Sequence, residues 1–84
     1  NGKFMNDSAK VFAKRLRDEA GTAPADQVAR AFEIAFSRKP SDKEVSSGLA
    51  MIKDMRSKGG VSAEVALERF ALLALNLNEF VYLD

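Results

Sequence analysis

The sequence predicts an all-α fold, a compact bundle of four helices followed by a short apolar C-terminal tail. Two observations predict it. Apolar residues recur at intervals of three and four through four segments, and glycine or proline separates these segments, at Gly21, Pro40 and Gly59-Gly60. With 84 residues, of which 46% are hydrophobic, residues 1–84 are expected to form one small helical domain with a single core. Connections of two to five residues favour antiparallel neighbours.

The first helix is expected to begin at Asn6 or Asp7, both favourable N-caps, and to end at Ala20 before Gly21. Its apolar positions step by four, three and four, which places them in one stripe: Met5, Ala9, Phe12, Leu16 and Ala20. Three cations are expected on the opposite face: Lys10, Lys14 and Arg17.

The second helix is expected to begin around residues 22–24, because Pro24 suits a first turn that needs no N–H group from it. It should stop before Lys39-Pro40, since proline disfavours helix at the preceding residue. Its buried stripe comprises Val28, Ala31, Phe32, Ala35 and Phe36.

The third helix opens with a capping box, in which Ser41 accepts from the Glu44 N–H group and the Glu44 side chain reaches back. Its buried stripe comprises Val45, Leu49, Ile52 and Met55. Gly48 lies on the same face, although a mid-helix glycine costs about 1 kcal/mol relative to alanine. We therefore expect a neighbouring helix to approach closely at Gly48, and we expect Gly59-Gly60 to end this helix.

The fourth helix should be capped by Ser62 and run from Ala63 to about Leu77. It is apolar nearly all round, which predicts the central position in the bundle. Asn76 and Asn78 are interpreted as residues that end it; the alternative is that their amides orient a ligand. The tail, Phe80–Leu83, is expected to fold back on the bundle or to form a contact surface, and only Glu79 to Leu83 suits an extended backbone.

The absence of cysteine and histidine excludes disulfides, thiolate metal sites and the usual haem ligands from this chain. The net charge is +1, but it is unevenly distributed. Residues 1–60 carry twelve Lys/Arg and eight Asp/Glu, whereas residues 61–84 carry one Arg and four Asp/Glu. An acidic C-terminal segment is thus expected to pack on a mildly basic body. The longest apolar run, Phe70–Leu75, is far below the ~20 residues that span a bilayer, so no membrane insertion is expected.

The carboxylates with the best spacing for catalysis are Glu64 and Glu68, four residues apart on one helix face. The simpler interpretation is two solvated glutamates near a helix N-terminus, where the dipole favours them. No Ser-x-x-Lys spacing occurs, and Gly59-Gly60 lacks the context of a phosphate loop. The sequence therefore predicts no enzyme, and no catalytic, cofactor-binding or metal-binding residue.

The second and third helices, with their short joint, are similar to a helix-turn-helix that would contact nucleic acid through four cations: Arg30, Arg38, Lys39 and Lys43. The third helix opens with Asp42 and Glu44, however, which would be aimed at the phosphates. The basic stripe of the first helix is interpreted as a solvated face, paired with Asp7 and Asp18. Asn6-Asp7-Ser8 fits a glycosylation sequon, but a helix cap explains it better.

Several short motifs occur in an order that resembles a known bacterial family: the opening Asn1–Met5, "AKVFAKRL" at 9–16, "AFEIAFSRKPSDKE" at 31–44, and Asn76 with Asn78-Glu79-Phe80. They resemble the C-terminal part of a domain of unknown function that closes large multidomain proteins of planctomycete bacteria. Ser37 stands where a glycine is common and Lys39 where a proline often stands, and the upstream part of that domain is missing. The resemblance implies an extracytoplasmic parent protein with a cytochrome-c-like domain, whose haem chemistry would lie outside these residues.

The expected function is therefore that of a non-catalytic helical module with a structural or domain-interaction role, packing against other domains of its own parent chain. The chain starts without methionine, which agrees with a C-terminal fragment of a larger protein. One alternative is an accessory part of an enzyme or redox site of the parent, contributed near Arg38 or Asn78. A less favoured alternative is a small nucleic-acid-binding domain.

Overall fold

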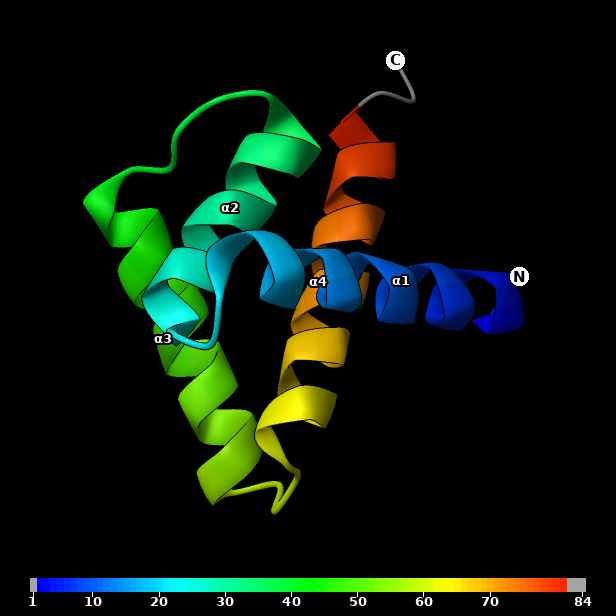
Figure 1. Cartoon of the computed structure of the whole chain (residues 1–84), viewed down its shortest axis with the longest axis vertical. Coiled ribbons are helices and arrows are strands. Elements are labelled where there is room, and N and C mark those ends of the chain that lie inside the picture. Colours follow the sequence, from blue (N-terminus) through cyan, green and yellow to red (C-terminus); the bar gives the residue numbers. More distant parts are fainter. Residues whose placement is uncertain (1, 82–84) are drawn as a thin grey trace.

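The computed structural model confirms the all-α fold with four helices (Figure 1). It describes residues 2–81; for residues 2, 4, 5 and 78–81 it describes the backbone only. The helices are α1 (Gly2–Ala20), α2 (Pro24–Phe36), α3 (Asp42–Ser57) and α4 (Ala63–Val81).

Helix α4 contacts each of the other three helices, as α2 also does, and its contact with α1 is the most extensive in the bundle. Helices α3 and α4 are antiparallel: they meet at the turn that joins them and spread apart with distance from it. Helix α1 runs across α4 (Figure 1). Within residues 2–81, α1 and α3 share no close backbone contact. The crossing of α1 and the spreading of α3 leave the two ends of α4 in different surroundings.

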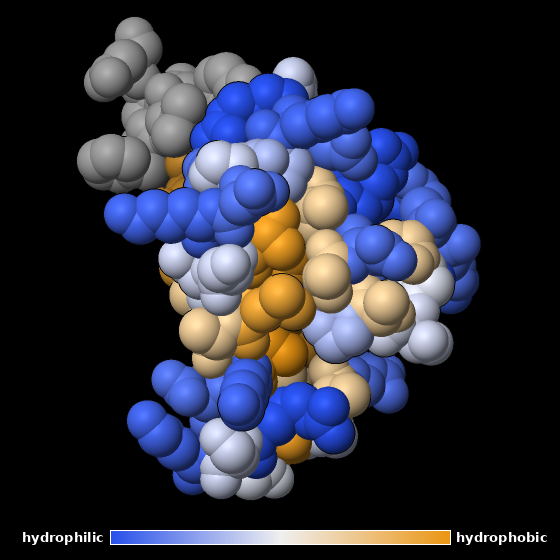
Figure 2. Space-filling view, turned by 90° about the vertical axis from the view of Figure 1, so that its left-hand side faces the viewer, coloured by the Kyte–Doolittle hydropathy of each residue, from blue (hydrophilic) through white to orange (hydrophobic). Residues whose placement is uncertain are grey.

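The core consists of twelve buried residues, mostly from α1 and α4: Ala9, Phe12, Ala13, Leu16, Val28, Ala31, Ile52, Ala66, Leu67, Phe70, Ala71 and Ala74. Half of these are alanines, whose small side chains allow the helices to approach closely. Leu16 and Val28 are the largest fully buried side chains. On the side of the molecule that faces left in Figure 1, further apolar residues gather in a band between polar ones (Figure 2). Apolar surface thus extends beyond the core.

Helix α1 begins at Gly2, so the prediction of an N-terminus at Asn6 or Asp7 is wrong. Both residues are helical and exposed, and no helix breaker other than Gly2 precedes them. Ordinary helix formers at residues 3–5 extend the helix beyond the favourable capping residues. The capping explanation of the Asn6-Asp7-Ser8 sequon is therefore wrong as well.

Arg17 does not lie on the fully solvated face predicted for it. Its side chain is one-third exposed, its Nη2 atom lies 4.0 Å from Glu64 Oε1, and its Nη1 atom is buried. The reason is that Arg17 directly follows Leu16, about 100° around the helix, so it lies at the edge of the buried stripe and its guanidinium reaches the first turn of α4. Lys10 and Lys14 are exposed as expected.

The turn between α2 and α3 follows the sequence signals closely. Helix α2 ends at Phe36, and Ser37 adopts the left-handed conformation with φ 55°, donating its N–H group to the Glu33 carbonyl oxygen at 3.0 Å. The predicted capping box of α3 is confirmed. Ser41 Oγ accepts from the Glu44 N–H group at 3.1 Å, and Glu44 Oε1 accepts from the Ser41 N–H group at 2.8 Å.

The predicted close approach at Gly48 is confirmed too. Gly48 is buried, and a Cβ atom built there would lie 2.7 Å from Val28 Cγ1. Two helices can be this close only where one of them lacks a side chain.

Helix α4 starts as predicted, with Ser62 Oγ accepting from the Val65 N–H group at 3.1 Å. It ends at Val81, however, so the interpretation of Asn76 and Asn78 as helix-ending residues is wrong. Asparagine costs only a fraction of a kcal/mol inside a helix, and the surrounding leucines favour continuation. Residues 79–81 are helical rather than extended. The expected fold-back of Phe80–Leu83 lies outside the described part of the chain, which includes neither the side chains of residues 80 and 81 nor residues 82 and 83.

Candidate functional site

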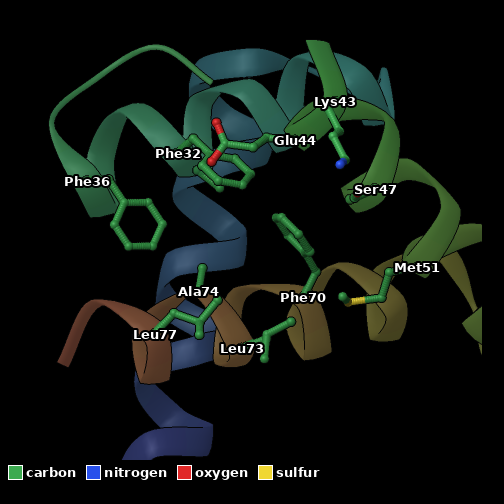
Figure 3. Close-up of a pocket in the computed structure, with 12 residues that line it drawn as sticks. Phe32, Phe36, Lys43, Glu44, Ser47, Met51, Phe70, Leu73, Ala74 and Leu77 are labelled. Carbon is green, nitrogen blue, oxygen red and sulfur yellow. The ribbon is translucent and has the colours of Figure 1, made fainter. Parts of the chain in front are cut away.

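An apolar groove lies between α2, α3 and α4 and has a volume of ≈ 250 Å³. We call it the interhelical groove. Figure 3 shows the side chains that surround it. Its apolar lining comprises Ala31, Phe32 and Phe36 of α2, Gly48 and Met51 of α3, and Phe70, Leu73, Ala74 and Leu77 of α4; its polar residues are Lys43, Glu44 and Ser47.

Residue size explains why a groove exists at this place. Ala31, Gly48 and Ala74 contribute almost no side-chain volume, and all three are buried. Larger side chains stand around them, including Phe32 and Phe36, which are one turn apart on α2 with ring centroids separated by 5.6 Å. Small residues surrounded by large ones leave a hollow.

The groove is open at the end where α2 and α4 finish. Leu77 is 47% exposed there, although it is a large aliphatic residue. Phe32 and Phe36 are only half-buried. Since α3 and α4 spread apart, no helix in the described part of the chain covers these three side chains (Figures 1 and 3).

Arg38 holds one wall of the groove in place. Its guanidinium forms a bidentate pair with Glu44, with Nη1–Oε1 and Nη2–Oε2 distances of 2.8 and 2.7 Å. The same guanidinium carbon lies 6.0 Å from the ring centroids of both Phe32 and Phe36, within the range of a cation–π contact. One side chain thus connects the first turn of α3 to the two rings of α2.

These contacts also set the ionisation of the groove rim. The hydrogen bonds from Arg38, and then the backbone N–H group of Ser41, lower the pKa of Glu44 to about 2. The bond to Glu44 in turn raises the pKa of Arg38. A carboxylate with so low a pKa is a weak base at neutral pH, and it is a poor proton donor because it stays ionised. Arg38 and Glu44 are therefore suited to hold structure rather than to transfer protons.

The other sequence candidates do not converge on the groove. Glu64 is exposed and lies near Arg17, and Glu68 is half-buried on the next turn. Asn76 is exposed in the last part of α4, whereas the side chain of Asn78 lies outside the described part. Among the side chains that the structure describes, no three acidic ones are grouped in a way that would hold a metal ion.

Two of the four cations considered for nucleic-acid binding are held by carboxylates. Arg30 donates to Glu19 at 2.8 Å and lies 3.5 Å from Glu33, and Arg38 is bound by Glu44. The pairing with Arg15 and Arg30 lowers the pKa of Glu19. Lys39 and Lys43 are exposed.

Sequence reasoning missed the groove, because it assigned Phe32, Phe36 and the leucines of the last helix to the core. The sequence carried no signal for the groove, because a helix that is apolar nearly all round predicts burial, and how far its neighbours cover it depends on how the helices cross.

No protein-family model, curated protein or solved structure matches this chain. None of the helices within residues 2–81 combines the length and the apolar character that crossing a membrane requires. The geometry of the groove is therefore the main basis for a functional argument.

Proposed function

We propose that this chain is a non-catalytic helical module with a structural or domain-interaction role in a larger bacterial protein. In this proposal, the interhelical groove receives a segment of another domain of the same polypeptide. One observation carries the proposal: a groove lined by nine apolar residues opens to the surface beside the exposed Leu77. Burying the exposed half of a leucine contributes about 1 kcal/mol, so covering this end stabilises any complex that forms there.

The chemistry of the groove supports a binding role over a catalytic one. Its polar side chains are Lys43, Glu44 and Ser47, and Glu44 is engaged by Arg38. A general acid or base would need a pKa near the working pH, whereas that of Glu44 is lowered to about 2. The alternative of an enzyme site near Arg38 is disfavoured for the same reason, since its guanidinium is already bound.

The resemblance to the planctomycete domain supports the same conclusion. The stretch "AFEIAFSRKPSDKE" that carries the resemblance contains Arg38, Ser41 and Glu44, which form the bidentate pair and the capping box beside the groove. In this proposal these residues fix the shape of a docking surface. The parent would then be an extracytoplasmic protein with a cytochrome-c-like domain.

The absence of cysteine from the chain makes a direct test possible. A single Leu77→Cys substitution places one thiol at the open end of the groove. In the isolated chain this thiol should react rapidly with a water-soluble maleimide. In the polypeptide encoded by the complete open reading frame, its reaction should be slower by about tenfold or more, because a docked segment excludes the reagent. Peptide mass spectrometry distinguishes this thiol from others in the parent.

Ala50→Cys is the matched control. Ala50 is exposed on α3 and does not line the groove, so its thiol should react equally fast in both polypeptides. Equal reaction of Leu77→Cys in both, or an open reading frame without a further domain, would show that the proposal is wrong.

A further inference from the structure

The rim of the interhelical groove carries one positively charged side chain, Lys43. Lys43 is exposed, and Figure 3 shows its amino group directed toward the groove opening, beside Ser47. The neighbouring Glu44 is bound by Arg38 through both oxygens. Among the side chains that the structure describes, none forms an ion pair with Lys43.

The stability of α3 does not explain a lysine at this position. Lys43 lies in the first turn of its helix, where the positive end of the helix dipole disfavours a cation. Its two neighbours in the sequence, Asp42 and Glu44, are the residue types that suit a first turn. The position of Lys43 is thus unfavourable for the helix, but it faces the opening of the groove.

The size of the groove indicates what kind of group can enter it. Its volume of ≈ 250 Å³ is below the roughly 300–1,000 Å³ of typical small-molecule pockets. Space of this size suits one or two large apolar side chains of a protein segment. The exposed Leu77 at the open end also favours a protein partner, since a small ligand in the hollow would leave it uncovered.

We infer that the segment docked in the groove is amphipathic: it inserts one or two large apolar side chains between Phe36, Phe70 and Leu77, and it places an aspartate or glutamate beside Lys43. This inference rests on the proposed function and specifies its partner. The apolar insertion supplies most of the binding, and the ion pair fixes the orientation of the segment. A segment with a cation at that position would be rejected by like-charge repulsion.

The test uses the full polypeptide carrying Leu77→Cys and measures the rate of maleimide reaction. Adding Lys43→Glu should increase this rate by about tenfold, because attraction is replaced by repulsion. Lys53→Glu is the matched control, since Lys53 is an exposed lysine of the same helix outside the groove, and it should leave the rate unchanged. The helical circular dichroism of each isolated variant verifies that both still fold.

Salt provides a second measurement. With Lys43 present, raising the ionic strength should increase the reaction rate, because screening weakens an exposed ion pair. With Lys43→Gln, the rate should no longer depend on salt.

The outcomes distinguish failure of the inference alone from failure of the proposed function. If Leu77→Cys is protected but Lys43→Glu changes nothing, the docked segment has no carboxylate there, and only the inference is wrong. An equal effect of Lys53→Glu would attribute the change to overall charge and would also overturn the inference. If Leu77→Cys is never protected, the proposed function itself fails. Protection that appears in the isolated chain as its concentration rises would assign the groove to a second copy and overturn both.

Discussion

Gly48 of α3 lies directly against Val28 of α2, so close that a Cβ atom at position 48 would be 2.7 Å from Val28 Cγ1. Carbon atoms in contact are normally about 3.5–4.0 Å apart. Val28 is fully buried and Phe70 Cε1 lies 3.3 Å from the same point, so a side chain at position 48 would meet both neighbours. The missing side chain of Gly48 therefore sets the distance between α2 and α3 and forms part of the groove floor.

Replacing Gly48 should consequently destabilise the fold. We expect Gly48→Leu to lower the free energy of unfolding by well over 1 kcal/mol through overpacking, as measured by urea denaturation. Ala50→Leu, at an exposed position of the same helix, should change it by less than about 0.5 kcal/mol. Gly48→Ala should cost less in a Val28→Ala background than in the unaltered chain. Equal costs in the two backgrounds would show that the contact does not limit packing.

Ser37 offers a stabilising substitution. It is the one non-glycine residue with positive φ in the described chain, at 55°. The left-handed conformation costs about 1–2 kcal/mol for a residue with a Cβ atom, and the greater backbone entropy of unfolded glycine offsets part of this. Ser37→Gly should therefore raise the free energy of unfolding by about 0.5–1 kcal/mol. Ser46→Gly, in the interior of α3, should lower it by roughly 0.5 kcal/mol. A loss of stability in Ser37→Gly would contradict the strain argument.

The Arg38–Glu44 pair predicts a specific dependence of stability on pH. The pKa of Glu44 is lowered to about 2 from an ordinary value of 4.5. A depressed pKa contributes stability that is complete above about pH 4.5 and is lost as the pH falls toward 2. The lowered pKa of Glu19 acts in the same direction. Below pH 4.5, the stability of the unaltered chain should therefore decrease.

Glu44→Gln isolates the contribution of the Arg38–Glu44 pair to this pH dependence, because glutamine keeps the shape of the side chain and can still complete a capping box. The difference in urea midpoint between the two proteins should be largest near pH 6 and should shrink as the pH approaches 2. Parallel curves across this range would mean that Arg38 does not perturb Glu44.

Two residues of α1 test the assignment of its buried face. Leu16 is fully buried, whereas Val11 is 71% exposed. Leu16→Ala should lower the free energy of unfolding by about 2–5 kcal/mol, because it removes buried methyl groups and leaves a cavity. Val11→Ala should change it by less than about 0.5 kcal/mol. Comparable losses in the two variants, measured by urea denaturation, would place α1 in a different orientation.

Local signals in the sequence were sufficient to predict most of the secondary structure. The capping box at Ser41 and Glu44, the cap at Ser62 and the proline at residue 24 all act within one helical turn, so they can be recognised without the fold. Gly48 was recognised for the same reason, since a glycine on a buried stripe needs an explanation. The errors at Asn6, Asn76 and Asn78 have a common origin: good capping residues are only mildly unfavourable inside a helix, so neighbouring helix formers override them.

The sequence by itself determined that four helices form and which stripe of each is apolar, because the 3.6-residue period and the caps depend on neighbours along the chain. The tertiary structure alone decided which of these apolar residues remain open. Phe32, Phe36 and Leu77 belong to stripes that could all have been buried, yet α3 and α4 diverge and leave them around a groove. The crossing of helices depends on side chains far apart in the sequence, such as Gly48 and Val28, and their combined packing sets the shape of the surface.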